Sequence, residues 1–198
     1  MTAYQRKTKY YRGVVYEYNL PVGHSCPFAK LCLVKVDKKT GKFENKSSNY
    51  KCYAAAAERF PGVRNSRWTN FENAKNSIVP HPPKLAKSIR VHGSGDFFSQ
   101  SYFDCWIDIA LQNPEKEFWA YTKSLKYWVR RITEIPDNLV LTASVGGTDD
   151  YLISDHNLKH VVVVASDKDT LLPIDTNDDL ARDPSIKCFA LIDNYAKK

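Results

Sequence analysis

Residues 117–148 read EFWAYTKSLKYWVRRITEIPDNLVLTASVGGT, and this stretch decides the expected fold. Its residue types and turn signals predict a strand over Glu117–Tyr121, a helix over Ser124–Ile132 and a second strand over Asn138–Ala143. Two strands joined through a helix favour parallel pairing with a right-handed crossover. The stretch therefore predicts an α/β fold built around a parallel sheet.

The same alternation of strands and helices extends on both sides of this stretch. About six strands are too few for a complete eight-stranded barrel, so we expect a partial (β/α) barrel or an open, curved, mostly parallel sheet. Residues 1–198 are expected to form a single α/β domain, with a small β-hairpin insertion over residues 33–50 near the cysteines. The apolar run His160–Val164 predicts a strand buried on both faces. The other expected strands are Val14–Leu20, Leu31–Val36, Ser88–Val91 and Cys188–Ile192.

Further helices are expected outside the opening stretch. The alanine-rich run Tyr53–Arg59 is helical by propensity, and Pro61-Gly62 is expected to end it. Serine residues at N-cap positions predict two more helices, over Arg67–Ile78 after Ser66 and over Gln100–Gln112 after Ser99.

Composition bounds the class of protein. The 198 residues are 43% hydrophobic, which is enough to bury a core and excludes a disordered tail. The sequence contains neither an apolar run of about 18–20 residues, as a membrane span needs, nor a secretory signal at its basic N-terminus. We therefore expect a cytoplasmic protein without membrane contact. The net charge of +7 favours an anionic partner such as nucleic acid or a nucleotide, although dispersed lysines fit plain solubility equally well.

The cysteines carry the most informative chemistry. Five cysteines are an odd number, which in an intracellular chain argues against a disulfide framework. Cys26, Cys32 and Cys52 follow the spacing C-x5-C-x19-C, and thiolates suit iron–sulfur clusters and zinc. The short C-x2–4-C pair that is usual at structural zinc sites is missing, although His24 could be a fourth zinc ligand. Three unrelated cysteines remain an alternative.

The two remaining cysteines stand alone. Cys105 lies in an expected amphipathic helix, and Cys188 begins an expected apolar strand. Both are interpreted as core residues. Either one could instead supply a fourth ligand to a metal centre.

Polar loops follow several of the expected strands. In a parallel sheet the carboxyl ends of the strands meet at one edge, which is where ligands bind in α/β folds. A glycine-rich turn ending in a carboxylate could approach a ligand closely, or Asp96 could simply cap the next helix. The loop 144–148 could cradle a phosphate or an adenosine group through its amides, or be an ordinary loop. The candidate ligand-binding residues are Ser94, Gly95, Asp96, Lys123, Ser144 and Gly146.

Several short motifs, in a fixed order along the chain, resemble those of a known protein family. They are NLPVGHSCP (19–27), CL (32–33), CYA (52–54), RVHGSGDFF (90–98), YTKS (121–124) and PDN (136–138). Together they resemble the phage protein family known as gene product 88, over residues 17–148. That family is in turn similar to radical S-adenosylmethionine enzymes, which place three cysteines after a first strand and a Gly-acid motif after a second.

The resemblance implies specific roles for residues. Cys26, Cys32 and Cys52 would hold a 4Fe-4S cluster. The run Ser94-Gly95-Asp96 would bind the amino group of S-adenosylmethionine, with Ser144 and Gly146 near its ribose or carboxylate. The chain departs from the usual compact C-x3-C-x2-C spacing, and has Asp96 where glutamate is more typical.

Three functions remain open at this point. The first is a radical enzyme that acts on a nucleotide or nucleic acid in the cytoplasm of the phage's host. The second is a non-catalytic iron–sulfur protein, whose cluster carries electrons to a redox partner or stabilises the fold. The third is a zinc-stapled nucleic-acid-binding module.

Overall fold

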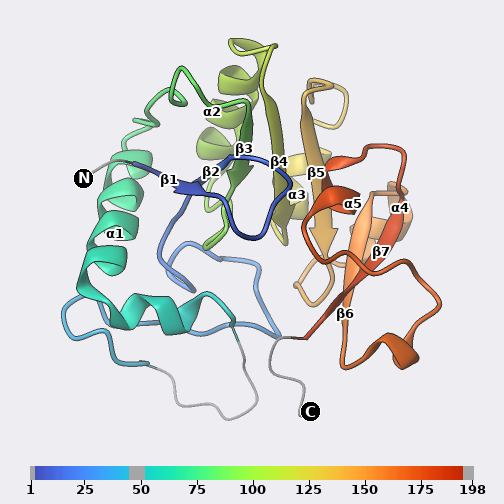
Figure 1. Ribbon diagram of the computed structural model, residues 1–198, viewed down its shortest axis with the longest axis horizontal. Coiled ribbons are helices and arrows are strands. Elements are labelled where there is room, and N and C mark those ends of the chain that lie inside the picture. The colour runs from blue at the N-terminus through green and yellow to red at the C-terminus, as the bar shows by residue number, and fades with distance from the viewer. Residues whose placement is uncertain (1–2, 45–51, 194–198) are drawn as a thin grey trace.

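A seven-stranded sheet forms the centre of the protein, in the strand order β1-β2-β3-β4-β5-β6-β7 (Figure 1). The computed structural model describes residues 3–44 and 52–193. β1 pairs antiparallel with β2, and each later pair of neighbours is parallel. The sheet is open, with β1 and β7 at its edges, so it does not close into a barrel. The prediction of a mostly parallel α/β sheet is confirmed.

The elements alternate along the chain as the opening stretch predicted. The strands are β1 (Tyr4–Lys7), β2 (Val15–Tyr18), β3 (Ser88–Val91), β4 (Glu117–Thr122), β5 (Leu139–Ser144), β6 (His160–Val164) and β7 (Cys188–Ile192). The α-helices are α1 (Pro61–Lys75), α2 (Gln100–Leu111), α3 (Leu125–Val129), α4 (Tyr151–Asp155) and α5 (Asp179–Arg182). The 3₁₀ helices are η1 (Ala55–Arg59) and η2 (Asp167–Asp169).

Alternating side chains of the central strands divide the core into two layers. Phe118 and Leu141 face α1–α4, in the larger cluster of buried apolar residues. Trp119 and Val140 face the opposite side, in a smaller cluster that α5 helps to cover. Because successive strand residues point to opposite faces, β4 and β5 contribute to both layers and are nearly fully buried.

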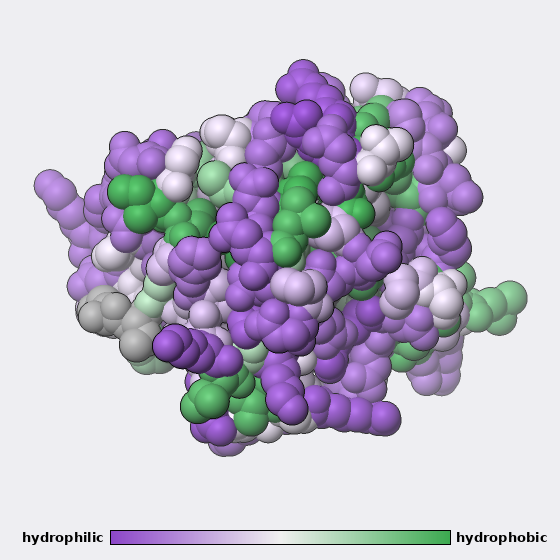
Figure 2. Space-filling model, turned by 90° about the horizontal axis from the view of Figure 1, so that it is seen from above, coloured by the Kyte–Doolittle hydropathy of each residue, from purple (hydrophilic) through white to green (hydrophobic). Residues whose placement is uncertain are grey.

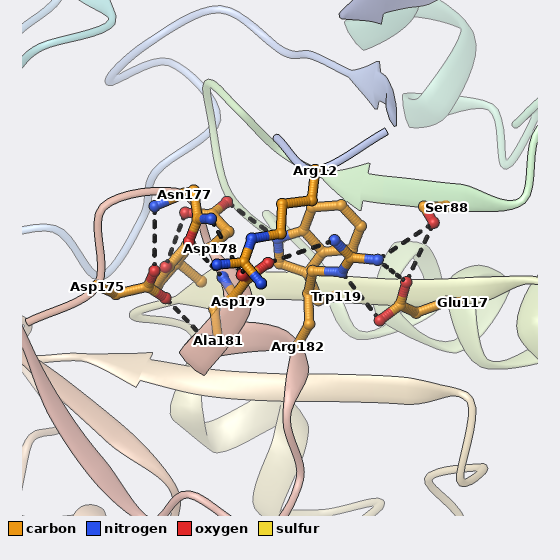
Figure 3. A network of polar contacts seen from close by, with 11 residues as sticks. Arg12, Ser88, Glu117, Trp119, Asp175, Asn177, Asp178, Asp179, Ala181 and Arg182 are labelled. Atoms are coloured by element: carbon orange, nitrogen blue, oxygen red, sulfur yellow. Dashed lines mark hydrogen bonds and ion pairs between the residues drawn. The ribbon is translucent and has the colours of Figure 1, made fainter. Parts of the chain in front are cut away.

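A polar network holds α5 against the smaller layer (Figure 3). The Trp119 indole Nε1 donates a 3.0 Å hydrogen bond to the Asp178 carboxylate, at the residue before α5. At the other end of the helix, the Arg182 guanidinium donates to both carboxylate oxygens of Glu117, at 3.0 and 2.6 Å. A bidentate arginine–carboxylate pair fixes orientation as well as position. The network thereby fixes α5 across β4.

The predictions for the first helices need correction. Pro61-Gly62 does not end a helix, because Pro61 is the first residue of α1. Proline suits that position, since the first amides of a helix have no intrahelical acceptor. Ser66 consequently lies inside α1, and the helix ends at Lys75 rather than at Ile78. The alanine-rich run forms only the short 3₁₀ helix η1.

The cysteine-bearing segment also differs from its prediction. Leu31–Val36 is not a strand of the sheet; Val36 alone forms an antiparallel bridge, with Phe43. The Asp37 amide donates to the Lys42 carbonyl at 2.8 Å, so this part of the expected hairpin turns back on itself. The rest of the expected insertion, residues 45–50, lies outside the described residues. β1 was missed because its four residues, YQRK, lack the apolar alternation of a strand.

Burial of the strand His160–Val164 on both faces was a wrong prediction. Only Val161 is fully buried in β6, and the Val163 side chain is 57% exposed. The strand lies next to the edge strand β7, and the crossover before it contains only the five-residue α4. An apolar sequence therefore marks β6 correctly as a strand but overstates how much of it is covered.

One face of the molecule is mostly polar (Figure 2). Seen from the side where β4 and β5 begin, hydrophilic residues cover most of the molecule and hydrophobic side chains form small separate groups (Figure 2). Among the described residues, none of the helices combines the length and the apolar character that crossing a bilayer requires.

Candidate functional site

One cavity gathers most of the residues singled out from the sequence. Its volume is ≈ 110 Å³, and it lies where β3, β4 and β5 end. Cys26, Cys32 and Cys52 all line it, although they come from separate segments of the chain. Of the other candidates, Ser94, Gly95, Asp96, Lys123 and Ser144 line the same cavity.

The loops around the cavity are joined by paired hydrogen bonds. The Leu20 amide donates to the Ser94 carbonyl and the Ser94 hydroxyl donates to the Leu20 carbonyl, both at 2.8 Å. These bonds continue the β2–β3 pairing beyond the strands. Gly95 is required here, since its φ is +89° and an added Cβ would lie 2.6 Å from Leu20 Cβ and from Ser25 Oγ. The Cys26 loop can therefore approach the loop after β3 closely.

A buried ion pair joins the segments that carry Cys26 and Cys52. Glu58, in η1, is fully buried, and its Oε1 accepts from the Val22 amide at 2.8 Å and from Arg67 Nη1 at 2.9 Å. Arg67 Nη1 also donates to the Ala54 carbonyl at 3.0 Å. A small apolar cluster that includes Val22 and Ala54 packs beside Cys52. Glu58 and Arg67 thus connect both cysteine segments to α1.

The three thiols influence one another electrostatically. Burial raises the pKa of all three, and most strongly that of Cys26. Asp96 and the other two thiols raise the pKa of Cys26 further, and Cys32 does the same for Cys52. Lys123 acts in the opposite direction on the pKa of Cys32. The thiols are therefore protonated at neutral pH unless a metal replaces their protons.

Asp96 has an internal role in the structure. Its Oδ1 accepts from the Thr122 hydroxyl at 2.6 Å and from the Phe97 amide at 2.8 Å, and its Oδ2 accepts from the Lys123 amide at 2.8 Å. Burial raises its pKa, and these three donors oppose that effect. Of the roughly four acceptor positions of a carboxylate, one on Oδ2 is left for a ligand. The main task of Asp96 is thus to join the loop after β3 to the end of β4.

His92 precedes this loop and is buried. Its Nε2 lies 2.8 Å from the Tyr102 hydroxyl, and its backbone adopts a left-handed φ of +66°. Burial lowers the pKa of His92 to about 3, so the ring is neutral at physiological pH. This is the environment of a buried residue at the end of a strand.

Lys123 and the loop after β5 form a second internal contact. The ammonium donates to Ser144 Oγ at 2.6 Å, to the Ser144 carbonyl at 2.9 Å and to the Val145 carbonyl at 3.2 Å. Gly146 is not among the lining residues, and its amide and that of Gly147 donate to the Asp150 carboxylate at 2.7 and 3.0 Å. The amides that could have cradled a phosphate therefore already hold a carboxylate of the chain itself.

Other candidates lie away from the cavity. His24 Nε2 is 3.1 Å from the Val36 carbonyl, and Cys188 Sγ is 3.1 Å from His160 Nε2. Neither these residues nor Cys105 line the cavity, and both lone cysteines are half-buried rather than core residues. Sequence reasoning missed Tyr53 and Tyr121 as lining residues, although Tyr53 directly follows Cys52 and Tyr121 lies at the carboxyl end of β4.

The spacing of the donor atoms limits which kinds of metal centre they could hold. Within residues 3–44 and 52–193, no three His, Cys, Asp or Glu side chains gather closely enough to hold one metal ion. Thiolates on a single zinc ion lie only about 3.8 Å apart, given a Zn–S bond of about 2.3 Å and tetrahedral angles. A cluster of several iron atoms binds thiolates that are further apart, because each sulfur ligates a different iron. In this protein, Cys26, Cys32 and Cys52 line one cavity, and among the described residues they do not form a single-ion site.

The fold and cavity define an α/β protein with a cysteine-lined pocket at the carboxyl edge of a parallel sheet. The family model described as gene product 88 matches residues 2–194, so the chain belongs to this family. The Gene 88 protein of Mycobacterium phage L5 is 40% identical over 58 residues, which cover 29% of this chain and 24% of that protein. The match thus spans about a quarter of the relative's length. No solved structure matches the chain.

Proposed function

We propose that the protein binds a 4Fe-4S cluster through Cys26, Cys32 and Cys52. The observation that carries this proposal is the lining of one cavity by three thiols from separate segments. Cysteine thiolates are the standard ligands of such clusters. The spacing C-x5-C-x19-C lacks the short C-x2–4-C pair that is usual at structural zinc sites, which favours a cluster over the zinc alternative.

The volume of the cavity helps to decide whether S-adenosylmethionine could bind there as a second ligand. The likeness to radical S-adenosylmethionine enzymes rests on sequence motifs alone. Small-molecule pockets usually measure about 300–1,000 Å³, whereas this cavity measures ≈ 110 Å³. The space suits a compact inorganic group better than an enclosed nucleoside cofactor, and Asp96 has little acceptor capacity left. We therefore propose an iron–sulfur protein whose cluster carries electrons or stabilises the fold, rather than a radical enzyme.

Anaerobic purification followed by iron and sulfide analysis tests the proposal. We expect about four iron and four sulfide per chain and a broad absorption at about 400 nm. Replacing Cys26, Cys32 and Cys52 together by alanine should abolish all three signals. The matched controls are Cys105→Ala and Cys188→Ala, which remove thiols outside the cavity and should leave the iron content unchanged. Zinc in place of iron, or equal iron in the triple variant, would refute the proposal.

Electron paramagnetic resonance separates the two iron–sulfur functions. The reduced cluster is measured with and without added S-adenosylmethionine. An unchanged spectrum supports the non-catalytic function. A changed spectrum would show that the ligand reaches the cluster, and would move the assignment to the radical enzyme.

A further inference from the structure

Lys123 is a cation in the wall of the cavity that would hold the proposed cluster. Among the described residues that line the cavity, it is the only lysine or arginine, and His92 there is neutral because burial lowers its pKa to about 3. The other charged or ionisable groups of the lining are Asp96, the two tyrosines and the three thiols. A cluster held by three thiolates beside Asp96 therefore lies in a negative environment. Lys123 is the lysine among the described lining residues that offsets it, whereas Arg67, near Cys52, is paired with Glu58 at 2.9 Å.

The Lys123 ammonium is held in place rather than free to bind a ligand. Its three protons are matched by three acceptors, Ser144 Oγ, the Ser144 carbonyl and the Val145 carbonyl. The Lys123 amide is fixed as well, through its bond to Asp96 Oδ2. With its donors already used inside the protein, the side chain can act on the cluster through its charge. Lys123 and the three cysteines line the same cavity, so the charge lies close to the proposed cluster.

We propose that Lys123 sets the reduction potential of the cluster bound by Cys26, Cys32 and Cys52. This inference rests on the proposed function. The oxidised cluster gains one electron from a one-electron donor, which is oxidised in turn, and no bond is broken. A fixed positive charge nearby stabilises the more negative reduced form, and cluster potentials depend on net charge and on the surrounding dipoles. Lys123 thereby makes the cluster easier to reduce.

A redox titration of the purified holoprotein tests this role. Dithionite is the reductant, and electron paramagnetic resonance reports the reduced fraction at each potential. In Lys123→Met we expect at least a tenfold fall in the ratio of reduced to oxidised cluster at a fixed potential, which corresponds to about 59 mV for one electron. Lys123→Arg keeps the charge and should restore most of the wild-type value.

The matched control is Lys126→Met. Lys126 lies three residues further along, carries the same charge and pairs with Asp149 at 2.9 Å instead of lining the cavity. Its removal should leave the potential unchanged. An equal shift in Lys126→Met would mean that overall charge, not the position of Lys123, sets the potential, and would overturn the inference.

The remaining outcomes separate this inference from the proposed function. A wild-type protein without iron refutes both. A loaded Lys123→Met protein with the wild-type potential refutes only the role of Lys123. If Lys123→Met loses the cluster, Lys123→Gln is titrated, because the amide keeps a donor for Ser144 without the charge. Loss of the cluster from both variants would make Lys123 a residue needed for assembly, and would overturn the inference.

Discussion

The buried pair of Glu58 and Arg67 offers the sharpest test of how the cysteine segments are held. Glu58 is fully buried, and the Arg67 side chain is 7% exposed. Glu58→Gln removes the negative charge but keeps the size of the side chain. The guanidinium is then left as a buried charge without its counter-ion, which typically costs 3–5 kcal/mol. The hydrogen bond from the Val22 amide is weakened as well, because a neutral amide oxygen is a poorer acceptor than a carboxylate oxygen.

The expected loss of unfolding free energy in Glu58→Gln can be measured as a lower midpoint of urea unfolding. A domain of this kind has a free energy of unfolding of about 5–15 kcal/mol, and an m-value of about 2 kcal/mol/M is typical. A loss of 3–5 kcal/mol then lowers the urea midpoint by about 1.5–2.5 M. Tryptophan fluorescence at pH 7 follows the transition in the metal-free protein.

Glu72→Gln is the matched control for this measurement. Glu72 also lies on α1, and its carboxylate pairs with Lys75 at 2.6 Å and with Lys38 at 3.3 Å. These side chains are 44–53% exposed, so water and salt screen the pairs and the loss should stay below about 1 kcal/mol. If Glu58→Gln costs no more than Glu72→Gln, the buried pair does not hold the segments and the reasoning fails.

Other perturbations test single contacts. His92 has a folded pKa of about 3, below its ordinary 6.5, so it is neutral in the fold and stability is lost as pH falls from 6.5 toward 3. Between pH 7 and pH 5 we expect the free energy of unfolding, measured by urea titration, to fall by about 2 kcal/mol. This fall should be smaller in His92→Gln; the same pH dependence of stability in both proteins would contradict the role of His92. Gly95→Ala forces a methyl group against Leu20 and should cost more than about 2 kcal/mol and lower the iron content; wild-type iron content would contradict this. Ser99→Ala removes the N-cap acceptor of α2 and should cost about 1 kcal/mol by thermal unfolding, with full iron content retained.

The parallel sheet and the location of the cavity could be predicted from the sequence because both follow from local patterns. Strand-like runs separated by helical runs dictate parallel pairing, and parallel pairing brings the carboxyl ends of strands to one edge. Asp96, Lys123 and Ser144 each follow or end a strand, so their approach required no knowledge of side-chain packing.

The details that the sequence did not reveal depend on contacts between distant residues. Pro61-Gly62 is compatible with either the end or the beginning of a helix, and the choice depends on how α1 packs. The amides of Gly146 and Gly147 were free in the sequence interpretation, but in the fold Asp150 occupies them. Asp96 could be placed at the cavity, whereas its bonds to the end of β4 could not be foreseen.

The two parts of the cavity wall differ in how they are held, and this difference matters for the proposed cluster. The wall formed by the ends of β3, β4 and β5 belongs to the paired strands of the sheet. The wall that carries the cysteines consists of loops, η1 and a small apolar cluster, joined to α1 through the Glu58–Arg67 pair. Metal binding contributes free energy to folding wherever its ligands come from segments that would otherwise move independently. A cluster on Cys26, Cys32 and Cys52 would therefore stabilise the cysteine-bearing loops far more than the sheet. The sheet would set the position of the site, and the cluster would hold the loops in place beside it.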